Sequence, residues 1–177
     1  FMAFVGSMLS MAELSIYGNE NDPITFKLYN SKTQTMYDHN VSNDGLKIII
    51  NEYIGSLSEP YAIKFNSVAK VGDVKFGRVN DAVNYAQAGD VVTVISDNEI
   101  TSTVVVNKNI TLDLNGKEIT AAENVYPVIR IQEEAEVSVT GNGAITNATD
   151  YVFVLGASDG SSAGMLAIEN GTFHGAT

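Results

Sequence analysis

Short segments of alternating apolar and polar residues follow one another along most of the chain, a pattern typical of β-strands with one buried face. Between residues 24 and 29, Ile24, Phe26 and Leu28 share one face, and the residues between them are polar. Turn-forming residues bound this segment and its neighbours at 12–17, 35–37, 46–51 and 61–65. The spacing predicts a small antiparallel β-sandwich in the first third of the chain.

One segment has helical periodicity instead. Val79, Ala82, Val83 and Ala86 recur at helical spacing, and Gly89 is placed to end a helix in the left-handed conformation. We therefore predict one amphipathic helix at about 79–88, followed by a strand at 91–95.

An internal repeat dominates the second half of the chain. Three segments align, beginning at Ile110, Val137 and Leu166, and each leads into an Asn-Gly pair; these pairs are 27 and 28 residues apart. Each pair is followed shortly by an apolar residue: Ile119, Ile145 or Phe173. A second apolar series recurs every 24 residues, beginning at Val104, Val128 and Val152. Three short β-rich stretches in each period of twenty-odd residues predict the rungs of a parallel β-helix, in which apolar residues stack inward.

The Asn-Gly pairs are predicted at corners of these rungs. A sharp corner needs residues with positive φ, and Gly and Asn adopt that conformation at the lowest steric cost. A two-residue hairpin would also use Asn-Gly. The long and nearly constant offset between the apolar strands favours corners.

Two stretches resemble known families. "FGRVNDAVNYAQAGDVVTVISDNEI", followed by "VVVNKNITLDLNGKEIT", resembles the start of a pectate-lyase-like right-handed parallel β-helix, over about residues 74–177. The resemblance implies that the helix caps the first rung. "ITFKLYNSKTQTMYD" resembles a β-sandwich module of large exported proteins of gut bacteria. We therefore expect an all-β protein: residues 1–68 a partial or small antiparallel β-sandwich, and residues 69–177 the N-terminal part of a right-handed parallel β-helix with a short capping helix.

Composition and charge narrow the classes of function. Apolar residues make up 45% and charged residues 18%, which is typical of a folded globular protein. The net charge of −11 disfavours nucleic-acid binding, because phosphate contacts need clustered Lys and Arg. The apolar run at residues 1–11 is too short to span a bilayer. An acidic exterior of this kind is typical of a secreted or cell-surface protein.

Five residues are candidates for facing a ligand. Asp113, Thr140 and Glu169 align at equivalent outward positions of three rungs, which would place the two carboxylates about 9 to 10 Å apart from the strand spacing. That distance suits an inverting glycosidase, but an ordinary polar outer face gives the same pattern, so we assign no catalytic residue. Tyr126 and Tyr151 lie at rung edges with Phe153, where flat aromatic faces suit pyranose rings, although packing also explains them.

Other titratable residues give no defined site. Arg130 lies in a strand, where we expect a salt bridge or solvent exposure rather than the base of a lyase. Glu133, Glu134 and Glu136 form an acidic cluster that could offer oxygen ligands to Ca²⁺, but they lack the spacing of a calcium loop. His39 and His174 are isolated from metal-ligand partners. We therefore predict no cofactor, with Ca²⁺ as the one open alternative. 

The leading hypothesis is a non-catalytic piece of a larger secreted or cell-surface bacterial protein, with a structural or adhesive role and carbohydrate or a host surface as its partner. One alternative is the N-terminal part of a polysaccharide lyase or glycoside hydrolase whose active site lies in further rungs. Another is a segment of a phage tail fibre or spike. No C-terminal capping motif follows the last repeat, so we expect either continuation or self-association at that end.

Overall fold

The computed structural model describes residues 19–38, 46–47, 65–157, 159–160 and 162–176. The chain divides into two compact units, one formed by 1–27 with 38–65 and the other by 28–37 with 66–177. The predicted strand at 12–17 and most of those at 46–51 and 61–65 lie outside the described residues. The sandwich and the domain boundary at 68 therefore stay predictions.

The described part of the first unit contains a local turn and a bridge. The Asn19 amide N–H donates to Asp22 Oδ2 at 2.9 Å. Pro23 and Lys47 form an isolated antiparallel bridge, and the Ile24 N–H donates to Leu46 O at 2.9 Å. These contacts hold residues 22–24 beside residues 46–47.

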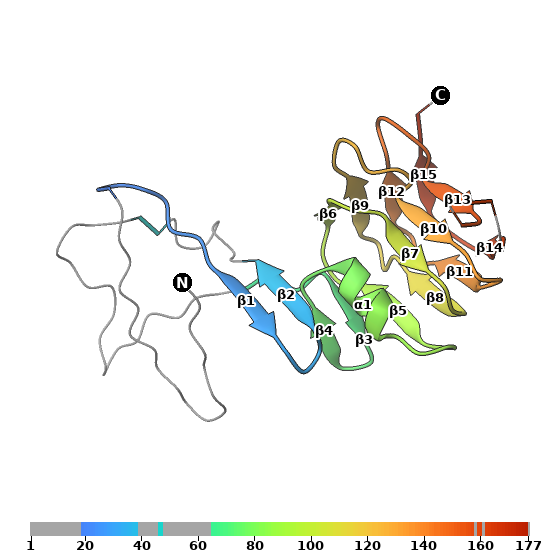
Figure 1. Ribbon diagram of the computed structural model, residues 1–177, viewed down its shortest axis with the longest axis horizontal. Helices are drawn as coiled ribbons and strands as arrows, with labels where there is room; N and C mark the ends of the chain where they lie inside the picture. The colour runs from blue at the N-terminus through green and yellow to red at the C-terminus, as the bar shows by residue number, and fades with distance from the viewer. Residues whose placement is uncertain (1–18, 39–45, 48–64, 158, 161, 177) are drawn as a thin grey trace. The chain divides into compact units, whose positions relative to one another are not determined.

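The second unit is built from three stacks of parallel strands (Figure 1). The strands are β5 (Val91–Val94), β6 (Asn98–Ile100), β7 (Val104–Val106), β8 (Ile110–Asp113), β9 (Glu118–Ala121), β10 (Ile129–Ile131), β11 (Glu136–Thr140), β12 (Ala144–Thr146), β13 (Phe153–Leu155), β14 (Met165–Ile168) and β15 (Thr172–His174). Every third strand pairs in parallel, giving the stacks β5-β8-β11-β14, β6-β9-β12-β15 and β7-β10-β13. We call three consecutive strands, one from each stack, a rung. The all-β class and the parallel stacking are confirmed, and the arrangement is compatible with a β-helix-like fold.

The register of two stacks follows the sequence repeat. Ile110 pairs with Val137 and Val137 with Leu166, while Ile119 pairs with Ile145 and Ile145 with Phe173, as predicted. In the third stack the predicted spacing of 24 residues is confirmed between β10 and β13, where Ile129 pairs with Phe153. Between β7 and β10 it is wrong by one position, because Val104 pairs with Ile129 and not with Val128. Val128 and Ile129 are both fully buried, so hydrophobicity alone does not fix which of them pairs.

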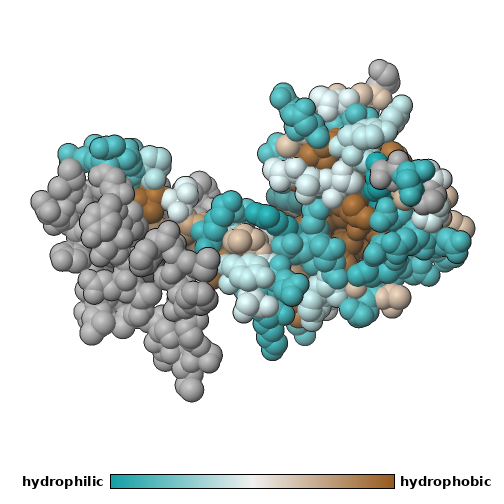
Figure 2. All heavy atoms as spheres, viewed as in Figure 1, coloured by the Kyte–Doolittle hydropathy of each residue, from teal (hydrophilic) through white to brown (hydrophobic). Residues whose placement is uncertain are grey.

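The core is formed by the inward-facing residues of the rungs. In the β5 stack, Val92, Leu112 and Val139 are stacked in register and are 0–3% exposed. The residue next in this column, Ile168, is 51% exposed because only one neighbouring rung packs against it. Figure 2 shows a mainly polar outer surface around these rungs, with hydrophobic residues visible between the polar ones.

The corners use positive φ, but not always at the predicted residues. Asn115 and Gly116 have φ values of 49° and 70°, as the Asn-Gly pattern predicts. In the next rung the left-handed residue is Gly141, with φ 79°, and not the Asn142-Gly143 pair. A Cβ on Gly141 would lie 2.6 Å from Asn115 N, so this corner passes too close to the previous one for a side chain.

An antiparallel hairpin closes the beginning of the β5 stack. Strands β3 (Ala69–Val71) and β4 (Val74–Phe76) pair with each other, and β3 also pairs antiparallel with β5. The sequence predicted only a helix that covers the first rung, and this hairpin was not predicted. The β3–β4 hairpin covers an edge that would otherwise leave β5 open to further strand pairing.

The predicted helix is present but shorter. Helix α1 (Val79–Tyr85) buries Val79, Ala82 and Val83, and it packs against β3, β4, β5 and β7. It ends before the predicted Ala88, because Ala86 is already extended with ψ 145°. Gly89 has the predicted positive φ, 90°, but it lies in the following turn, where its N–H donates to Asn109 O at 2.7 Å.

Strands β1 (Lys27–Asn30) and β2 (Thr35–Asp38) form a second hairpin. It is hydrogen-bonded to helix α1 through the Asp81 carboxylate. Asp81 Oδ2 accepts from the Thr35 hydroxyl at 2.7 Å and from the Met36 N–H at 3.2 Å. Thr35 is fully buried, and its Oγ1 accepts from the Gly77 N–H at 3.3 Å. One acidic side chain therefore satisfies two donors of the hairpin.

Tyr37 makes a further hydrogen bond between the hairpin and β4. Its hydroxyl donates to Lys75 O at 2.5 Å. Burial raises the pKa of Tyr37, and the charge of Asp81 raises it further, since both disfavour the phenolate. The stability contributed by the protonated hydroxyl is present below about pH 10 and is lost as the pH rises through the raised pKa.

Inward and outward positions of β7 provide a matched test of the stacked core. Val106 is 1% exposed and its neighbour Val105 is 41% exposed. We expect Val106→Ala to lower the free energy of unfolding by about 1.5–3 kcal/mol, from lost apolar burial and the remaining cavity. Val105→Ala should stay within about 0.5 kcal/mol of the wild type. Urea denaturation measures both, and equal losses would contradict the inward–outward assignment.

The hydrogen bonds between Asp81 and the β1–β2 hairpin give a second prediction. Asp81→Ala should cost about 1–3 kcal/mol, because the buried Thr35 hydroxyl and the Met36 N–H lose their acceptor. Hydrogen exchange should show lost protection at the Met36 amide. Asp73→Ala, in the exposed turn between β3 and β4, is the control and should leave that amide protected. An unchanged Met36 amide in Asp81→Ala would show that the carboxylate does not hold the hairpin.

Candidate functional site

The outer face of the β5-β8-β11-β14 sheet carries short side chains in register. Thr111, Ser138 and Ala167 are paired across β8, β11 and β14, and they alternate with residues that are buried in β8 and β11. Pairing of Glu136 with Met165 continues the same face toward the beginning of the strands. Because adjacent strands lie about 4.8 Å apart, equivalent side chains form columns with that repeat.

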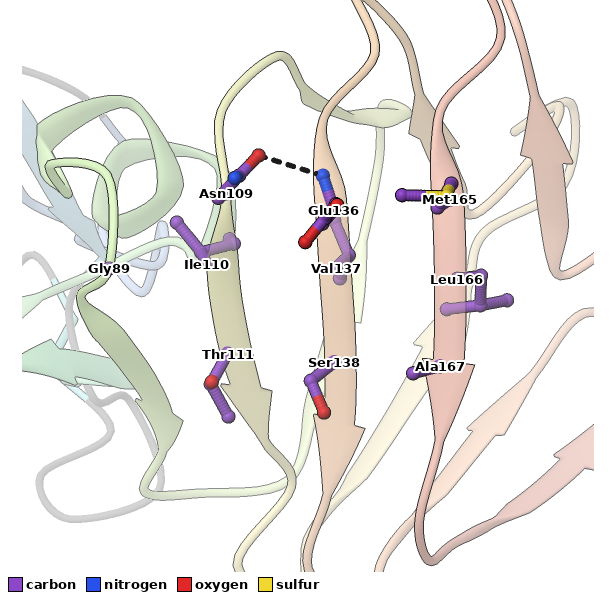
Figure 3. A pocket seen from close by; sticks show the side chains of 10 residues that line it. All are labelled: Gly89, Asn109, Ile110, Thr111, Glu136, Val137, Ser138, Met165, Leu166 and Ala167. Atoms are coloured by element: carbon purple, nitrogen blue, oxygen red, sulfur yellow. Dashed lines mark hydrogen bonds between the residues drawn. The ribbon is translucent and has the colours of Figure 1, made fainter.

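A groove runs over the beginning of these three strands (Figure 3). Its volume is about 470 Å³. It is lined by Gly89, Asn109, Ile110, Thr111, Glu136, Val137, Ser138, Met165, Leu166 and Ala167. The groove thus combines amide, hydroxyl and carboxylate groups with a larger apolar surface, to which the exposed Met165 contributes.

Asn109 orders one end of the groove. Its Oδ1 accepts from the Glu136 N–H at 2.9 Å, as the dashed line in Figure 3 shows. This bond links the beginnings of β8 and β11 and fixes the Asn109 amide against the neighbouring rung. The sequence reading missed Asn109 and Met165 as lining residues. The repeat contained the necessary signal, since the residues before Ile110 and Leu166 must share the outward face with Glu136.

The predicted column of Asp113, Thr140 and Glu169 is brought together on neighbouring strands. Asp113 pairs with Thr140, and Glu169 follows β14 with its N–H donating to Val139 O at 2.9 Å. These residues lie at the far end of the strands and do not line the groove. Whether they face a ligand stays a prediction.

Both carboxylates of that column have local hydrogen-bond partners. Asp113 Oδ1 accepts from the Asn115 N–H at 2.9 Å and so supports the corner. Glu169 Oε1 accepts from the Ser138 hydroxyl at 3.3 Å. These contacts give Asp113 a structural role at the turn.

Tyr126 and Tyr151 are brought together as an exposed pair, away from the groove. Their ring centroids are 6.0 Å apart with an interplanar angle of 53°. Tyr126 is 51% exposed and Tyr151 59% exposed. Phe153, which the sequence grouped with them, is half-buried and packs against Phe173 at 5.2 Å. The aromatic set therefore divides into a surface pair and a packed pair.

The remaining candidates do not converge. Arg130 is half-buried on β10, and its Nη1 donates to Gly156 O at 3.1 Å, a partner that the sequence did not predict. Glu133 and Glu134 lie in a turn with φ 59° each, whereas Glu136 begins β11 and lines the groove. His174 is exposed on β15, and His39 lies outside the described residues.

The described residues lack two further features. No group of three or more His, Cys, Asp or Glu side chains is arranged there to hold a metal ion. Of the helical segments in the same ranges, none has the length and apolar character needed to cross a bilayer.

Asn147 is a buried loop residue that the sequence analysis did not single out. Its side chain is polar, yet it is only 1% exposed. Its side-chain Oδ1 accepts from the Thr149 N–H, the Thr149 hydroxyl and the Asp150 N–H, each at 3.1 Å. No periodic signal distinguishes such a buried loop amide from an exposed one.

Comparison of the chain with protein-family models, with curated proteins and with solved structures finds no match.

Proposed function

We propose that this chain is a non-catalytic, structural and adhesive module of a larger secreted or cell-surface bacterial protein, and that it binds carbohydrate in the groove over β8, β11 and β14. We also propose that the parallel strands form a right-handed, pectate-lyase-like β-helix and that a small β-sandwich precedes it. The stacked strands are the rigid scaffold, and the groove is the binding surface.

One observation carries the binding role: hydrogen-bonding side chains repeat in register along the groove. Thr111 and Ser138 are paired on neighbouring strands, and Asn109 is fixed against Glu136. A polymer with repeated hydroxyl groups can make equivalent contacts with Thr111 and Ser138, because the two strands lie about 4.8 Å apart, while Ala167 at the third position leaves room for the chain. Met165, which is 56% exposed, adds an apolar surface for a sugar face.

The lyase or hydrolase alternative rests on the column of Asp113, Thr140 and Glu169. Its two carboxylates lie two strands apart on one face, which is the arrangement that inverting hydrolysis needs. The turn contact of Asp113 argues against free movement of its carboxylate toward a substrate. The tail-fibre or spike alternative requires a stable trimer, which analytical ultracentrifugation detects directly.

Blocking the groove tests the proposed function. Thr111→Phe should fill the groove. The dissociation constant for a polysaccharide, measured from retardation of the protein in gels that contain it, should rise about tenfold or more, because a loss of about 1.4 kcal/mol of binding free energy has that effect. Thr120→Phe is the matched control, because Thr120 is an exposed threonine on β9, in another stack. It should bind as the wild type does.

The probes for this experiment are soluble xylan, β-glucan, mannan and polygalacturonate, with product analysis in parallel. We expect retardation by at least one polysaccharide without new reducing ends or unsaturated products. Equal binding by Thr111→Phe and wild type would exclude the groove as the site. Product formation that is lost in Asp113→Asn and Glu169→Gln would establish the enzyme alternative instead.

A further inference from the structure

Tyr126 and Tyr151 occupy adjacent surface positions on two neighbouring rungs. Tyr126 precedes β10 and Tyr151 precedes β13, and these strands pair with Ile129 opposite Phe153. The rings touch, with centroids 6.0 Å apart, yet each side chain remains more than half exposed. Two large aromatic side chains are thus held side by side at the surface, where a ligand can contact both.

A buried amide fixes the loops that carry both rings. Asn147 Nδ2 donates to Val125 O at 3.0 Å, next to Tyr126, and to Tyr151 O at 3.2 Å. The Thr103 hydroxyl, with one proton to donate, lies 2.7 Å from Pro127 O and 3.0 Å from Tyr126 O on the same loop. Because Asn147 is 1% exposed and bonds to both loops, the separation of the two rings is set from the protein interior. Such preorganisation lowers the entropy lost when a ligand binds.

We propose that this aromatic pair is a binding platform for a neutral, β-linked pyranose oligosaccharide, distinct from the groove. The inference rests on the proposed carbohydrate-binding role and names a second contact surface for it. The C–H faces of β-linked glucose or xylose units are flat and apolar, so they stack on exposed tyrosine rings. Both ring edges also carry a hydroxyl for hydrogen bonding.

The ring geometry favours an extended ligand over a small cation. A cation cage needs aromatic faces set apart around the charge. Here the rings contact each other at 6.0 Å and 53°, which leaves no space between them for a ligand. Their exposed faces, tilted by 53° to each other, can instead contact neighbouring sugar units of one chain.

The local charge selects against acidic polysaccharides. Asp150 precedes Tyr151 directly, and its Oδ1 accepts from the Tyr151 N–H at 2.8 Å. Glu123 is exposed in the loop that leads to Tyr126. Together with a net charge of −11, these carboxylates repel a polyuronate, whereas a neutral chain pays no such cost.

The test is an NMR titration of the full chain carrying Thr111→Phe, so that the groove is blocked while the platform is intact. Cellohexaose and xylohexaose are the neutral probes, and hexagalacturonate is the acidic one. We expect a neutral hexasaccharide to shift the ring resonances of Tyr126 and Tyr151 together, and hexagalacturonate to leave them unchanged. Tyr126→Ala and Tyr151→Ala should each weaken binding about tenfold, from loss of one stacking surface.

Two controls separate stacking from other effects. Tyr29→Ala removes another tyrosine, 56% exposed on β1, and should not alter binding. Tyr126→Phe and Tyr151→Phe keep the ring faces and should bind within about threefold of the parent protein, since losing one solvent-exposed neutral hydrogen bond, at the lower end of the usual range, changes affinity about two- to threefold.

The outcomes also distinguish the platform from the groove. Polysaccharide binding that is lost in Thr111→Phe and retained in both tyrosine variants would overturn the platform and leave the proposed function standing. Hexasaccharide binding that persists in Thr111→Phe and is lost in the tyrosine variants would support the platform alone. No ring shift with either neutral probe at millimolar concentration, or a shift with hexagalacturonate only, would overturn the inference.

Discussion

In-register parallel pairing between equivalent strands of successive rungs is the constraint on which the second unit depends. A pairing such as Leu112 with Val139 stacks two apolar side chains inside and, one residue along, stacks Asp113 on Thr140 outside. A slip of one residue in any strand would exchange these two faces. The hydrophobic core and the exposed columns are therefore fixed by the same backbone hydrogen bonds. Any binding surface on the strands is a consequence of the register.

The edge strands of the stacks must also be protected from pairing with other chains. An unpaired parallel strand exposes backbone N–H and C=O groups that pair readily with other chains. At the β5 edge an antiparallel hairpin provides this protection. Ala69 and Val71 of β3 pair there with Val94 and Val92 of β5. Helix α1 then covers apolar side chains that the hairpin does not reach, and Asp81 on this helix holds the β1–β2 hairpin. The first strands β5 and β7 are thus covered by the β3–β4 hairpin and by helix α1.

The sequence predicted what depends on periodicity and missed what depends on single contacts. The repeat of Ile110, Val137 and Leu166 gave the correct stacking, because inward positions must be apolar in every rung. It failed at Val128, where two consecutive apolar residues are both buried. The β3–β4 hairpin was missed because it occurs once and so produces no repeat. The Asn142-Gly143 pair does lie in the turn between β11 and β12, but the positive φ predicted for it falls on Gly141, where the previous corner leaves no room for a side chain.

The two candidate surfaces differ in the same way: one follows from the periodicity of the strands, and the other depends on single contacts. The groove is built from strand residues, so aligning the repeat suffices to place Asn109, Glu136 and Met165 on one face. The tyrosine pair is built from loops, whose positions the strand register leaves free, and a repeat can show only that the two loops are neighbours. Fixing them requires a polar group inside the protein, and burying an amide is costly unless its hydrogen-bonding groups are satisfied. Asn147 meets that condition with two donated and three accepted hydrogen bonds, and the bonds that satisfy it are those that hold the loops. The burial of this one amide and the exposure of two aromatic rings are thus linked features of the same pair of rungs.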